Sequence, residues 1–307
     1  MGRCESNGFV RRRDSRSEQR FGFPVRERRE DFGLQTAKDR ILKMKNTQKI
    51  YAKLNLNLYV KGMDDGGYHL IESYVTSLNI YDEITVTTRT DDEITVTYNN
   101  INPNVPLNAD KAYIAGKAFV EKLGTKGCDI EITKNIPLGG GLGGSSADIS
   151  GVIRCLKELN GKKDEDVLPL LNELGSDTVF MYNGGFAKIS GRGNVVEAIE
   201  SDAKMYFVLA YPDFSVDSKT AYESYDENPT TNRFAEYYYN ALYNGVAEKF
   251  PALKKIKTAL EQTKATGVSM TGSGSVMFAV YGSGQERNEA YDGLKADGVT
   301  FIKAESL

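Results

Sequence analysis

The 307-residue sequence has few of the residues that metal enzymes and disulfide-rich proteins use. It contains one histidine and three widely spaced cysteines, Cys4, Cys128 and Cys155. So few soft ligands argue against a transition-metal enzyme and against a disulfide framework, and they predict a reducing, cytoplasmic setting. No apolar run approaches the roughly 18 residues that span a bilayer, so we expect no membrane partner.

Positive charge is concentrated near the N-terminus. Residues 1–45 carry 13 Lys and Arg against 7 Asp and Glu, whereas the remainder carries 26 against 35. The leader lacks apolar periodicity and interleaved aromatic residues, so we predict a disordered segment and no nucleic-acid partner. It is too acidic for a transit peptide and has no apolar core for a secretory signal. We therefore expect residues 1–45 to be a disordered or non-native leader, with Met44 as the natural start.

The strongest local signal is a glycine-rich stretch that leads into a helix. Five of the six residues from 139 to 144 are glycine, so backbone N–H groups there can approach a ligand closely. Apolar residues then recur at helical spacing to Leu159, and Ser145 and Asp148 form a capping-box-like pair. A glycine loop before a helix N-terminus is typical of a phosphate site, although a glycine-rich turn beside a core helix is the alternative.

The sequence also distinguishes among phosphate loops. No Gly-Lys-Ser/Thr follows the glycines, which excludes a Walker A loop. A dinucleotide-binding pattern is satisfied literally, but Pro137 interrupts the strand before it and the acidic Glu158 lies inside the helix. The stretch resembles the phosphate loop of the galactokinase, homoserine kinase, mevalonate kinase and phosphomevalonate kinase superfamily, the GHMP kinases. The resemblance implies that the ATP phosphates are bound by Pro137, Gly139, Gly140, Gly141, Leu142, Gly143, Gly144, Ser145, Ser146 and Ala147.

An alternating segment, residues 50–60, precedes the only histidine. One of its faces is apolar and predicts core, while the other, with Lys53 and Asn55, is either a solvated face or a site. The combination Ala-Lys-Leu-Asn-Leu and Asp-x-Gly-Tyr-His resembles the opening of the 4-diphosphocytidyl-2-C-methyl-D-erythritol kinase family of the non-mevalonate isoprenoid pathway. By that resemblance Lys53 lies at the reacting centre, Asn55 faces substrate, and Tyr68 and His69 line the cytidine pocket.

Three later segments also match that family. Asp177 is a turn or cap residue on local grounds, but it matches the aspartate proposed as catalytic base, with Val179 in place of the family's proline. Tyr222 falls where the family has an aromatic residue that stacks on cytosine, although a packing role is equally open. A third glycine motif, which supports the phosphate loop in the family and is otherwise a flexible turn, comprises Thr271, Gly272, Ser273 and Gly274.

Local patterns predict the remaining elements. Residues 78–88 and 93–98 are expected to form a hairpin around the turn 89–92, and Asn108 is expected to cap a helix that ends before Gly124. Further strands are predicted at 128–136, 182–189, 205–211, 276–281 and 299–304, and further helices at 164–174, 219–222 onward, 232–250 (tyrosine-rich), 253–263 and 286–294.

Together the resemblances predict an α+β, two-domain GHMP kinase fold. A ribosomal protein S5-like ATP-binding domain is expected over residues 46–200 and a ferredoxin-like domain over 201–307. The implied activity is transfer of phosphate from ATP, with Mg²⁺ near Ser145 or Ser146, to the C2 hydroxyl of a small-molecule substrate bearing a cytidine diphosphate group, in a monomer or homodimer. The alternatives are a kinase for mevalonate, phosphomevalonate or homoserine, and a non-catalytic nucleotide-binding relative.

Overall fold

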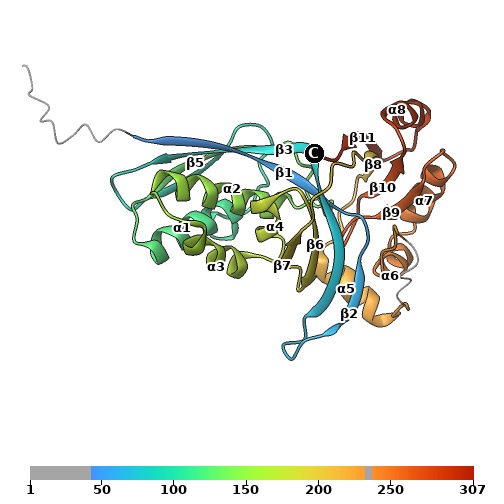
Figure 1. The fold of residues 1–307 in the computed structure, drawn as a ribbon, viewed down its shortest axis with the longest axis horizontal. Coiled ribbons are helices and arrows are strands. Elements are labelled where there is room, and N and C mark those ends of the chain that lie inside the picture. The colour runs from blue at the N-terminus through green and yellow to red at the C-terminus, as the bar shows by residue number, and fades with distance from the viewer. Residues whose placement is uncertain (1–42, 232–236) are drawn as a thin grey trace, which may run out of the picture. The chain divides into compact units, whose positions relative to one another are not determined.

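The computed structural model describes residues 43–231 and 237–307, which fold around two β-sheets (Figure 1). The predicted leader lies outside the described residues except for its last three. Of those three, Lys45 already opens the first strand, and the backbone N–H of Met44 donates to Thr88 Oγ1 at 3.0 Å. Residues that alternate or run apolar along the sequence supply the cores of both sheets.

Within the described residues, the first sheet has seven strands, arranged around the long strand β3. In order along the sheet they run β4-β5-β3-β6-β7, and β1 and β2 both pair with β3. Because β3 is 20 residues long, its successive parts can pair with four partners. The strands are β1 (Lys45–Asn55), β2 (Tyr59–Met63), β3 (His69–Thr88), β4 (Ile94–Tyr98), β5 (Cys128–Thr133), β6 (Phe186–Gly191) and β7 (Val195–Ala198).

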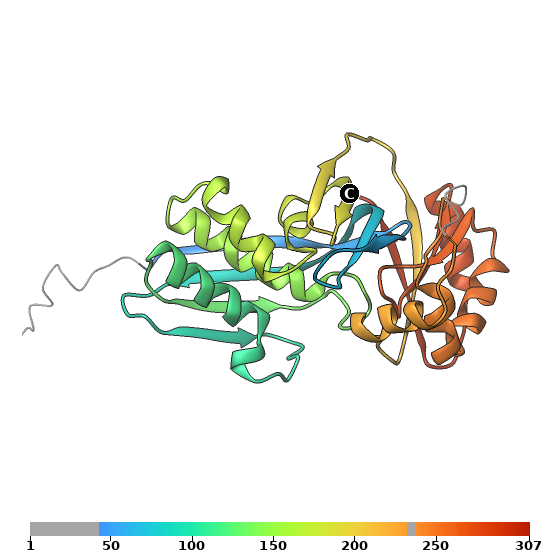
Figure 2. The ribbon, with the colours of Figure 1, turned by 90° about the horizontal axis from the view of Figure 1, so that it is seen from below.

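Helices form a layer on this sheet (Figures 1 and 2). The glycine-loop helix α2 packs on β1 and β3, and Gly151 allows close approach because a Cβ there would lie 2.7 Å from the Ile84 side chain. The predicted strand 182–189 is shorter than expected, since α4 occupies its first residues. The helical segments are η1 (Leu107–Ala109), α1 (Lys111–Leu123), α2 (Gly144–Leu159), α3 (Asp164–Leu174) and α4 (Thr178–Asn183).

The second sheet is antiparallel, with the order β11-β8-β10-β9. This order, with helices between the strands, confirms the ferredoxin-like expectation and the α+β fold class. The sequence pattern does not predict β9. The strands are β8 (Tyr206–Pro212), β9 (Gly267–Met270), β10 (Met277–Tyr281) and β11 (Val299–Glu305), and the helices are α5 (Ser218–Glu227), α6 (Tyr243–Lys249), α7 (Ala252–Glu261) and α8 (Gly284–Gly293).

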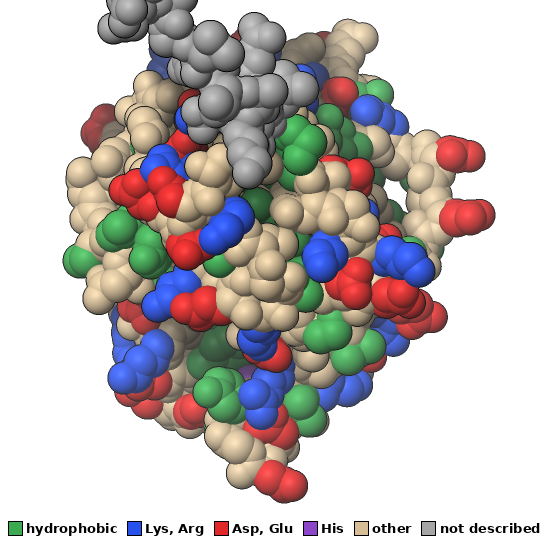
Figure 3. Space-filling view, turned by 90° about the vertical axis from the view of Figure 1, so that its left-hand side faces the viewer, with side chains coloured by type: hydrophobic (Ala, Val, Ile, Leu, Met, Phe, Trp, Pro, Cys, Tyr) green, Lys and Arg blue, Asp and Glu red, His purple; other side chains and the backbone are tan. Residues whose placement is uncertain are grey.

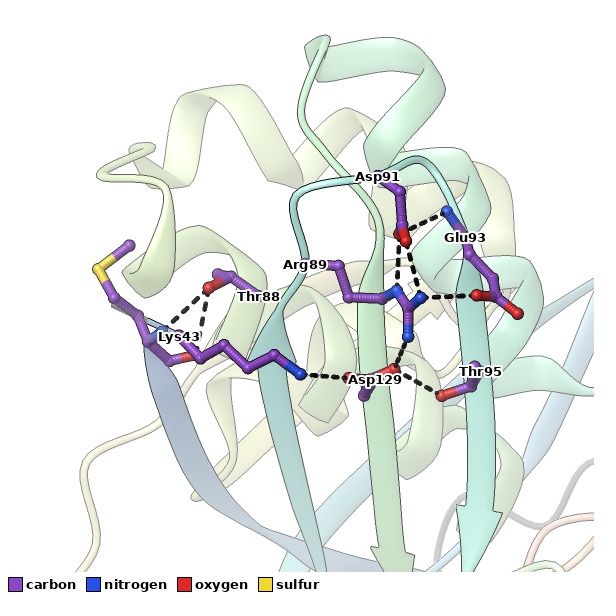
Figure 4. A network of polar contacts seen from close by, with 8 residues as sticks. Lys43, Thr88, Arg89, Asp91, Glu93, Thr95 and Asp129 are labelled. Carbon is purple, nitrogen blue, oxygen red and sulfur yellow. Dashed lines mark hydrogen bonds and ion pairs between the residues drawn. The ribbon is translucent and has the colours of Figure 1, made fainter. Parts of the chain in front are cut away.

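The predicted hairpin around the turn 89–92 is wrong. In the described sheet β5 lies between β3 and β4, antiparallel to the first and parallel to the second. A polar network holds this wide connection in place (Figure 4). The Arg89 guanidinium binds Asp91 at 2.7 Å and Glu93 at 2.6 Å, and on its other side it binds Asp129 of β5 at 2.7 Å. The turn therefore passes the first residues of β5 and does not close a hairpin between β3 and β4.

The cap predicted for the first helix is also wrong, whereas its end is confirmed. Asn108 lies in η1, and the N-cap of α1 is Asp110, whose carboxylate accepts hydrogen bonds from the backbone N–H groups of Ala112 and Tyr113 at 2.8 and 3.1 Å. Gly124 ends α1 in the left-handed conformation that favours glycine, with φ of 66°.

The tyrosine-rich helix expected over 232–250 is shorter than expected in the described residues. Residues 232–236 lie outside the described part of the chain, and α6 covers only the last third of the range. The backbone before α6 instead bridges to the first sheet, because Leu58 exchanges hydrogen bonds with Tyr239 and Ala241 at 2.7 and 2.9 Å. This pairing is non-local, so helical spacing alone could not reveal it.

The described surface mixes both signs of charge. On the face in Figure 3, Lys and Arg side chains are interspersed with Asp and Glu. Exposed helical pairs such as Lys117–Glu121, at 3.8 Å, have the i,i+4 spacing that supports a solvated helix face. Within the described residues, none of the helices has the length and apolar character needed to cross a membrane.

Candidate active site

The glycine loop joins β5 to α2 and borders a cavity of about 280 Å³. Gly139, Gly141 and Gly143 have φ values of 71°, 76° and 83°, which L side chains rarely adopt, so the loop requires glycine at these positions. Ala147 is buried behind the loop. The cavity is lined by Lys53, Pro137, Leu138, Gly139, Gly140, Gly141, Leu142, Gly143, Gly144, Ser145, Ser146, Asp177, Val216, Asp217, Ser218 and Ser273.

The start of α2 differs from the predicted capping box. Gly143, which has no side chain, is the N-cap residue. Asp148 turns into the interior, where its carboxylate lies 2.8 Å from Lys134 Nζ, while Ser145 is exposed beside the cavity. The first N–H groups of the helix are thereby left available to a ligand, as a phosphate site requires.

The third glycine motif packs directly against the glycine loop. A Cβ on Gly141 would lie 2.8 Å from the Thr271 carbonyl oxygen and 3.0 Å from that of Gly274, so the two backbones touch. The Tyr211 hydroxyl of β8 donates to the Leu138 carbonyl, which gives the loop a second contact with the second sheet. The structure thus brings together two glycine-rich segments more than 100 residues apart.

Lys53 lies near the end of β1 and is buried. Its backbone N–H donates to the Leu142 carbonyl of the glycine loop at 3.0 Å. Its Nζ lies 2.5 Å from Asn55 Oδ1 and 3.3 Å from Asp177 Oδ2. The alternative of a solvated polar face is wrong, because Lys53 and Asn55 are only 5% and 2% exposed. The alternating segment is also not one strand, since β1 ends at Asn55 and β2 begins at Tyr59.

A chain of hydrogen bonds fixes the orientation of Asn55. Its Nδ2 donates to Ser73 Oγ at 2.8 Å, and its backbone N–H donates to Thr271 Oγ1 at 2.9 Å. Gly272 closes over this pair, since a Cβ there would lie 3.2 Å from both Asn55 Oδ1 and Lys53 Nζ. The amide oxygen therefore faces the lysine, and it holds the ammonium group in the direction of Asp177.

Asp177 immediately precedes the short helix α4. Its carboxylate is 31% exposed, so it faces the cavity from the partly open side while Lys53 faces it from the buried side. Val179 occupies the second residue of α4, in the first turn, where proline is also tolerated. The departure from the family's proline is therefore compatible with the local backbone.

The structure brings His69 and Tyr222 together as a stacked pair. Their ring centroids are 4.7 Å apart with planes 21° from parallel, and His69 Nε2 lies 2.8 Å from Asp226 Oδ1. Burial raises the pKa of the Tyr222 hydroxyl, and the negative charge of Asp177 raises it further. The Tyr222 hydroxyl therefore lies close enough to Asp177 for the carboxylate charge to act on it.

Tyr68 is placed differently from its neighbour His69. Tyr68 is 59% exposed, and the Arg192 guanidinium lies 4.0 Å from the ring centroid. Arg192 is in turn held by Asp64, with Nε to Oδ2 at 2.6 Å. Tyr68 and Arg192 border a second cavity of about 420 Å³, which Ser176 also lines. Ser176 and Asp177 are adjacent in the sequence, so neighbouring residues of one segment line the two cavities.

Sequence reasoning missed Asn240, which supports the third glycine motif. Its Nδ2 donates to the carbonyl oxygens of Met270 and Gly272 at 2.7 and 2.9 Å, and its Oδ1 accepts from the Leu242 N–H at 2.9 Å. The residue is only 6% exposed. The sequence carried no signal for it beyond a polar residue inside a tyrosine-rich segment.

Comparison with known proteins identifies the family. The GHMP kinases N terminal domain model matches residues 110–188, and the GHMP kinases C terminal model matches residues 231–300. A curated relative from Caldicellulosiruptor saccharolyticus, 4-diphosphocytidyl-2-C-methyl-D-erythritol kinase, is 32% identical over 276 residues, which is 83% of this chain and 93% of the relative. The chain belongs to the 4-diphosphocytidyl-2-C-methyl-D-erythritol kinase family of the GHMP kinases. A member from Clostridium acetobutylicum is 31% identical over 81% of this chain and 95% of its own length.

Solved structures agree with this fold. A crystal structure of 4-(cytidine 5'-diphospho)-2C-methyl-D-erythritol kinase superposes with a TM-score of 0.73 at 24% identity, covering 85% of this chain and all of that chain. Homoserine kinase from Cytophaga hutchinsonii gives a TM-score of 0.61 at 19% identity, with 86% and 95% covered. At these identities the structural likeness supports the fold alone. The assignment to the specific family depends on the sequence relatives.

Proposed function

We propose that the protein transfers the γ-phosphoryl group of ATP to the C2 hydroxyl of 4-diphosphocytidyl-2-C-methyl-D-erythritol, a step of the non-mevalonate isoprenoid pathway. The observation that carries the proposal is the Lys53–Asp177 pair, with Nζ and Oδ2 3.3 Å apart, on the wall of the glycine-loop cavity. A phosphate site and a charged pair within one cavity are the parts that phosphoryl transfer needs. The sequence relatives supply the identity of the acceptor.

In this mechanism the two charged residues act on the acceptor hydroxyl. Asp177 accepts the hydroxyl proton, and Lys53, held by Asn55, orients the hydroxyl oxygen and offsets charge on the transferring group. Phosphoryl transfer passes through a loose transition state, so positioning and charge stabilisation matter more than the strength of the base. The backbone N–H groups of the loop and the N-terminus of α2 bind the ATP phosphates.

The cavity is compatible with Mg²⁺ carried by ATP. Among the described residues there is no group of three His, Cys, Asp or Glu side chains arranged to hold a metal ion. Mg²⁺ prefers phosphate oxygens and water together with one or two protein oxygens, and Ser145 and Ser146 both line the cavity. We therefore assign the metal to the phosphates, beside one of these hydroxyls, where it would neutralise phosphate charge.

The cytidine group is assigned to the aromatic side of the site. His69 and Tyr222 supply stacked flat surfaces, with Tyr222 within the influence of the Asp177 charge, and Tyr68 and Arg192 border the 420 Å³ cavity that Ser176 also lines. Stacking on a base is favourable for any aromatic ring, and polar groups around it select the base. We further propose that the enzyme works in the cytoplasm as a monomer or homodimer, without membrane or nucleic-acid partners.

The test of this function is ADP release by the purified full chain with ATP and Mg²⁺. We expect turnover with 4-diphosphocytidyl-2-C-methyl-D-erythritol and at least 100-fold lower kcat/KM with mevalonate, phosphomevalonate and homoserine, since these lack a base to bind at the aromatic site. Preferred turnover of another alcohol would keep the kinase and overturn the acceptor. ATP binding without turnover of any of the four would favour a non-catalytic relative.

Removing the ring of Tyr222 tests the base-binding role. Stacking of a base on an aromatic side chain contributes roughly 1–3 kcal/mol, so Tyr222→Ala should raise KM for the cytidyl substrate by about 5- to 150-fold while KM for ATP stays within twofold. Tyr222→Phe keeps the ring and serves as the matched control, with KM for the cytidyl substrate within threefold of wild type. An unchanged KM in the alanine variant would show that Tyr222 is a packing residue.

A further inference from the structure

Three charged side chains are buried together behind the glycine loop. Lys134, Asp82 and Asp148 are only 1%, 0% and 5% exposed. The Lys134 ammonium lies 2.5 Å from Asp82 Oδ2 and 2.8 Å from Asp148 Oδ1. Burying ions is costly, and replacing a buried ion pair with apolar residues is often neutral or stabilising. Stability alone therefore gives no reason for this cluster, which leaves its position in the fold to be explained.

The cluster contacts both ends of the glycine loop. On the incoming side, Asp82 Oδ1 accepts hydrogen bonds from the backbone N–H groups of Asn135 and Ile136 at 2.6 and 2.8 Å, just before the loop begins. On the outgoing side, Lys134 Nζ lies 3.2 Å from the Gly144 carbonyl oxygen, the first residue of α2. The seven residues between these two points are thus held at both ends by one ion cluster.

The cluster also joins three separate elements. Asp82 belongs to β3, Lys134 follows β5, and Asp148 lies in the first turns of α2. Burial raises the pKa of Asp148 to about 7, with the charges of Asp82 and Asp110 adding to the effect and Lys134 opposing it. Burial disfavours the charged form of Lys134 as well, but the two carboxylates outweigh it and keep its pKa raised. Lys134 therefore stays protonated and can act as donor to both sides.

We propose that Lys134 is a positioning residue for the ATP phosphates: with Asp82 and Asp148 it fixes both ends of the glycine loop and so aims the loop N–H groups and the start of α2. The inference rests on the proposed function, because it assumes that ATP phosphates bind at this loop. The proposal gives the buried cluster a role in nucleotide affinity. The cluster does not contact the residues assigned to the acceptor site.

The test uses a substitution that leaves the formal net charge of the buried cluster unchanged. Lys134→Met/Asp148→Asn removes one positive and one negative charge, and it leaves Asp82 bound to its two backbone N–H groups. We expect the Kd for ATP with Mg²⁺, measured calorimetrically on the full chain without acceptor, to rise at least tenfold. The Kd for 4-diphosphocytidyl-2-C-methyl-D-erythritol should stay within twofold. If the role of the cluster were purely structural, the double variant would have a lower melting temperature, and its affinities for the two ligands would not change differently.

The matched control lies at the other end of the same two strands. Arg89→Met/Asp129→Asn removes the ion pair between the end of β3 and β5 shown in Figure 4, which does not reach the glycine loop. This variant should keep the Kd for ATP within twofold. If the first double variant fails to fold, Asp148→Ala leaves Lys134 paired with Asp82 one to one, and it should raise the Kd for ATP at least fivefold.

The outcomes separate this inference from the proposed function. Wild-type ATP affinity in a folded Lys134→Met/Asp148→Asn variant, or in Asp148→Ala, would overturn the positioning role while the kinase assignment stands. An equal loss of affinity for ATP and for the cytidyl substrate would also overturn it, since that pattern indicates a general disturbance. A wild-type protein that binds no ATP would overturn both proposals.

Discussion

Asp177→Asn should lower kcat by about 10²–10⁴-fold while the Kd for ATP stays within threefold of wild type. The substitution keeps the shape of the side chain and removes its ability to accept the hydroxyl proton, and a positioned general base contributes an acceleration of this size. The carboxylate lies 3.3 Å from Lys53 Nζ and borders the cavity, but the phosphates are assigned to backbone N–H groups. Steady-state ADP release and equilibrium ATP binding measure the two quantities separately.

The control for this variant is an exposed carboxylate away from the cavity. Asp202 lies in the connection between β7 and β8 and is exposed, so Asp202→Asn should retain wild-type kcat. A kcat for Asp177→Asn within threefold of wild type would reject the base assignment. A large increase in the Kd for ATP would instead place Asp177 among the nucleotide-binding groups.

Lys53→Met should lower kcat by about 10²–10³-fold, the usual loss when one donor to a developing charge is removed. Methionine has nearly the length of lysine and suits a site only 5% exposed, so we expect the melting temperature to change little. Asp177 is left without its cation, but at 31% exposure water can solvate it. Single-turnover phosphate transfer would measure the loss, with thermal unfolding as the check on the fold.

The pair should also behave as a unit. If Lys53 and Asp177 act on the same hydroxyl, Lys53→Met/Asp177→Asn should be little slower than the slower single variant, as expected for residues that share one catalytic step. Lys126→Met is the matched control, because this exposed lysine contacts Asp92 at 2.8 Å and does not line the glycine-loop cavity. Multiplicative losses in the double variant would mean that the two residues contribute independently.

The parts of the fold that local chemistry determines could be predicted from the sequence. The glycine loop, the helix to Leu159 and the stop at Gly124 depend on backbone conformations and helical spacing within a few residues. The hairpin predicted around Arg89 is wrong, because the insertion of β5 between β3 and β4 is decided by pairing across about 40 residues. Strands that follow each other in the sequence pair as predicted only where no later strand pairs with the same edge.

The candidate site shows the same limit. The resemblance named Lys53, Asp177 and the glycine motifs, and the structure brings these together in one cavity region. The position of Lys134 is predictable in part, because it follows Ile130 and Ile132 at the inward positions of an alternating run. The pattern predicts that this lysine is buried. It does not identify the partners, one of which lies 52 residues earlier, because these depend on tertiary structure.

Gly272 couples the two halves of the chain through one close contact. It belongs to the motif beside the second sheet, yet the space for a Cβ is closed by Lys53 and Asn55 from the first. A half exchanged from a relative with a larger residue at this point would crowd the Lys53 ammonium group. A chimaera that joins halves from two relatives is therefore expected to keep Lys53 in place only where both sides of this contact fit each other, although each half has its own sheet.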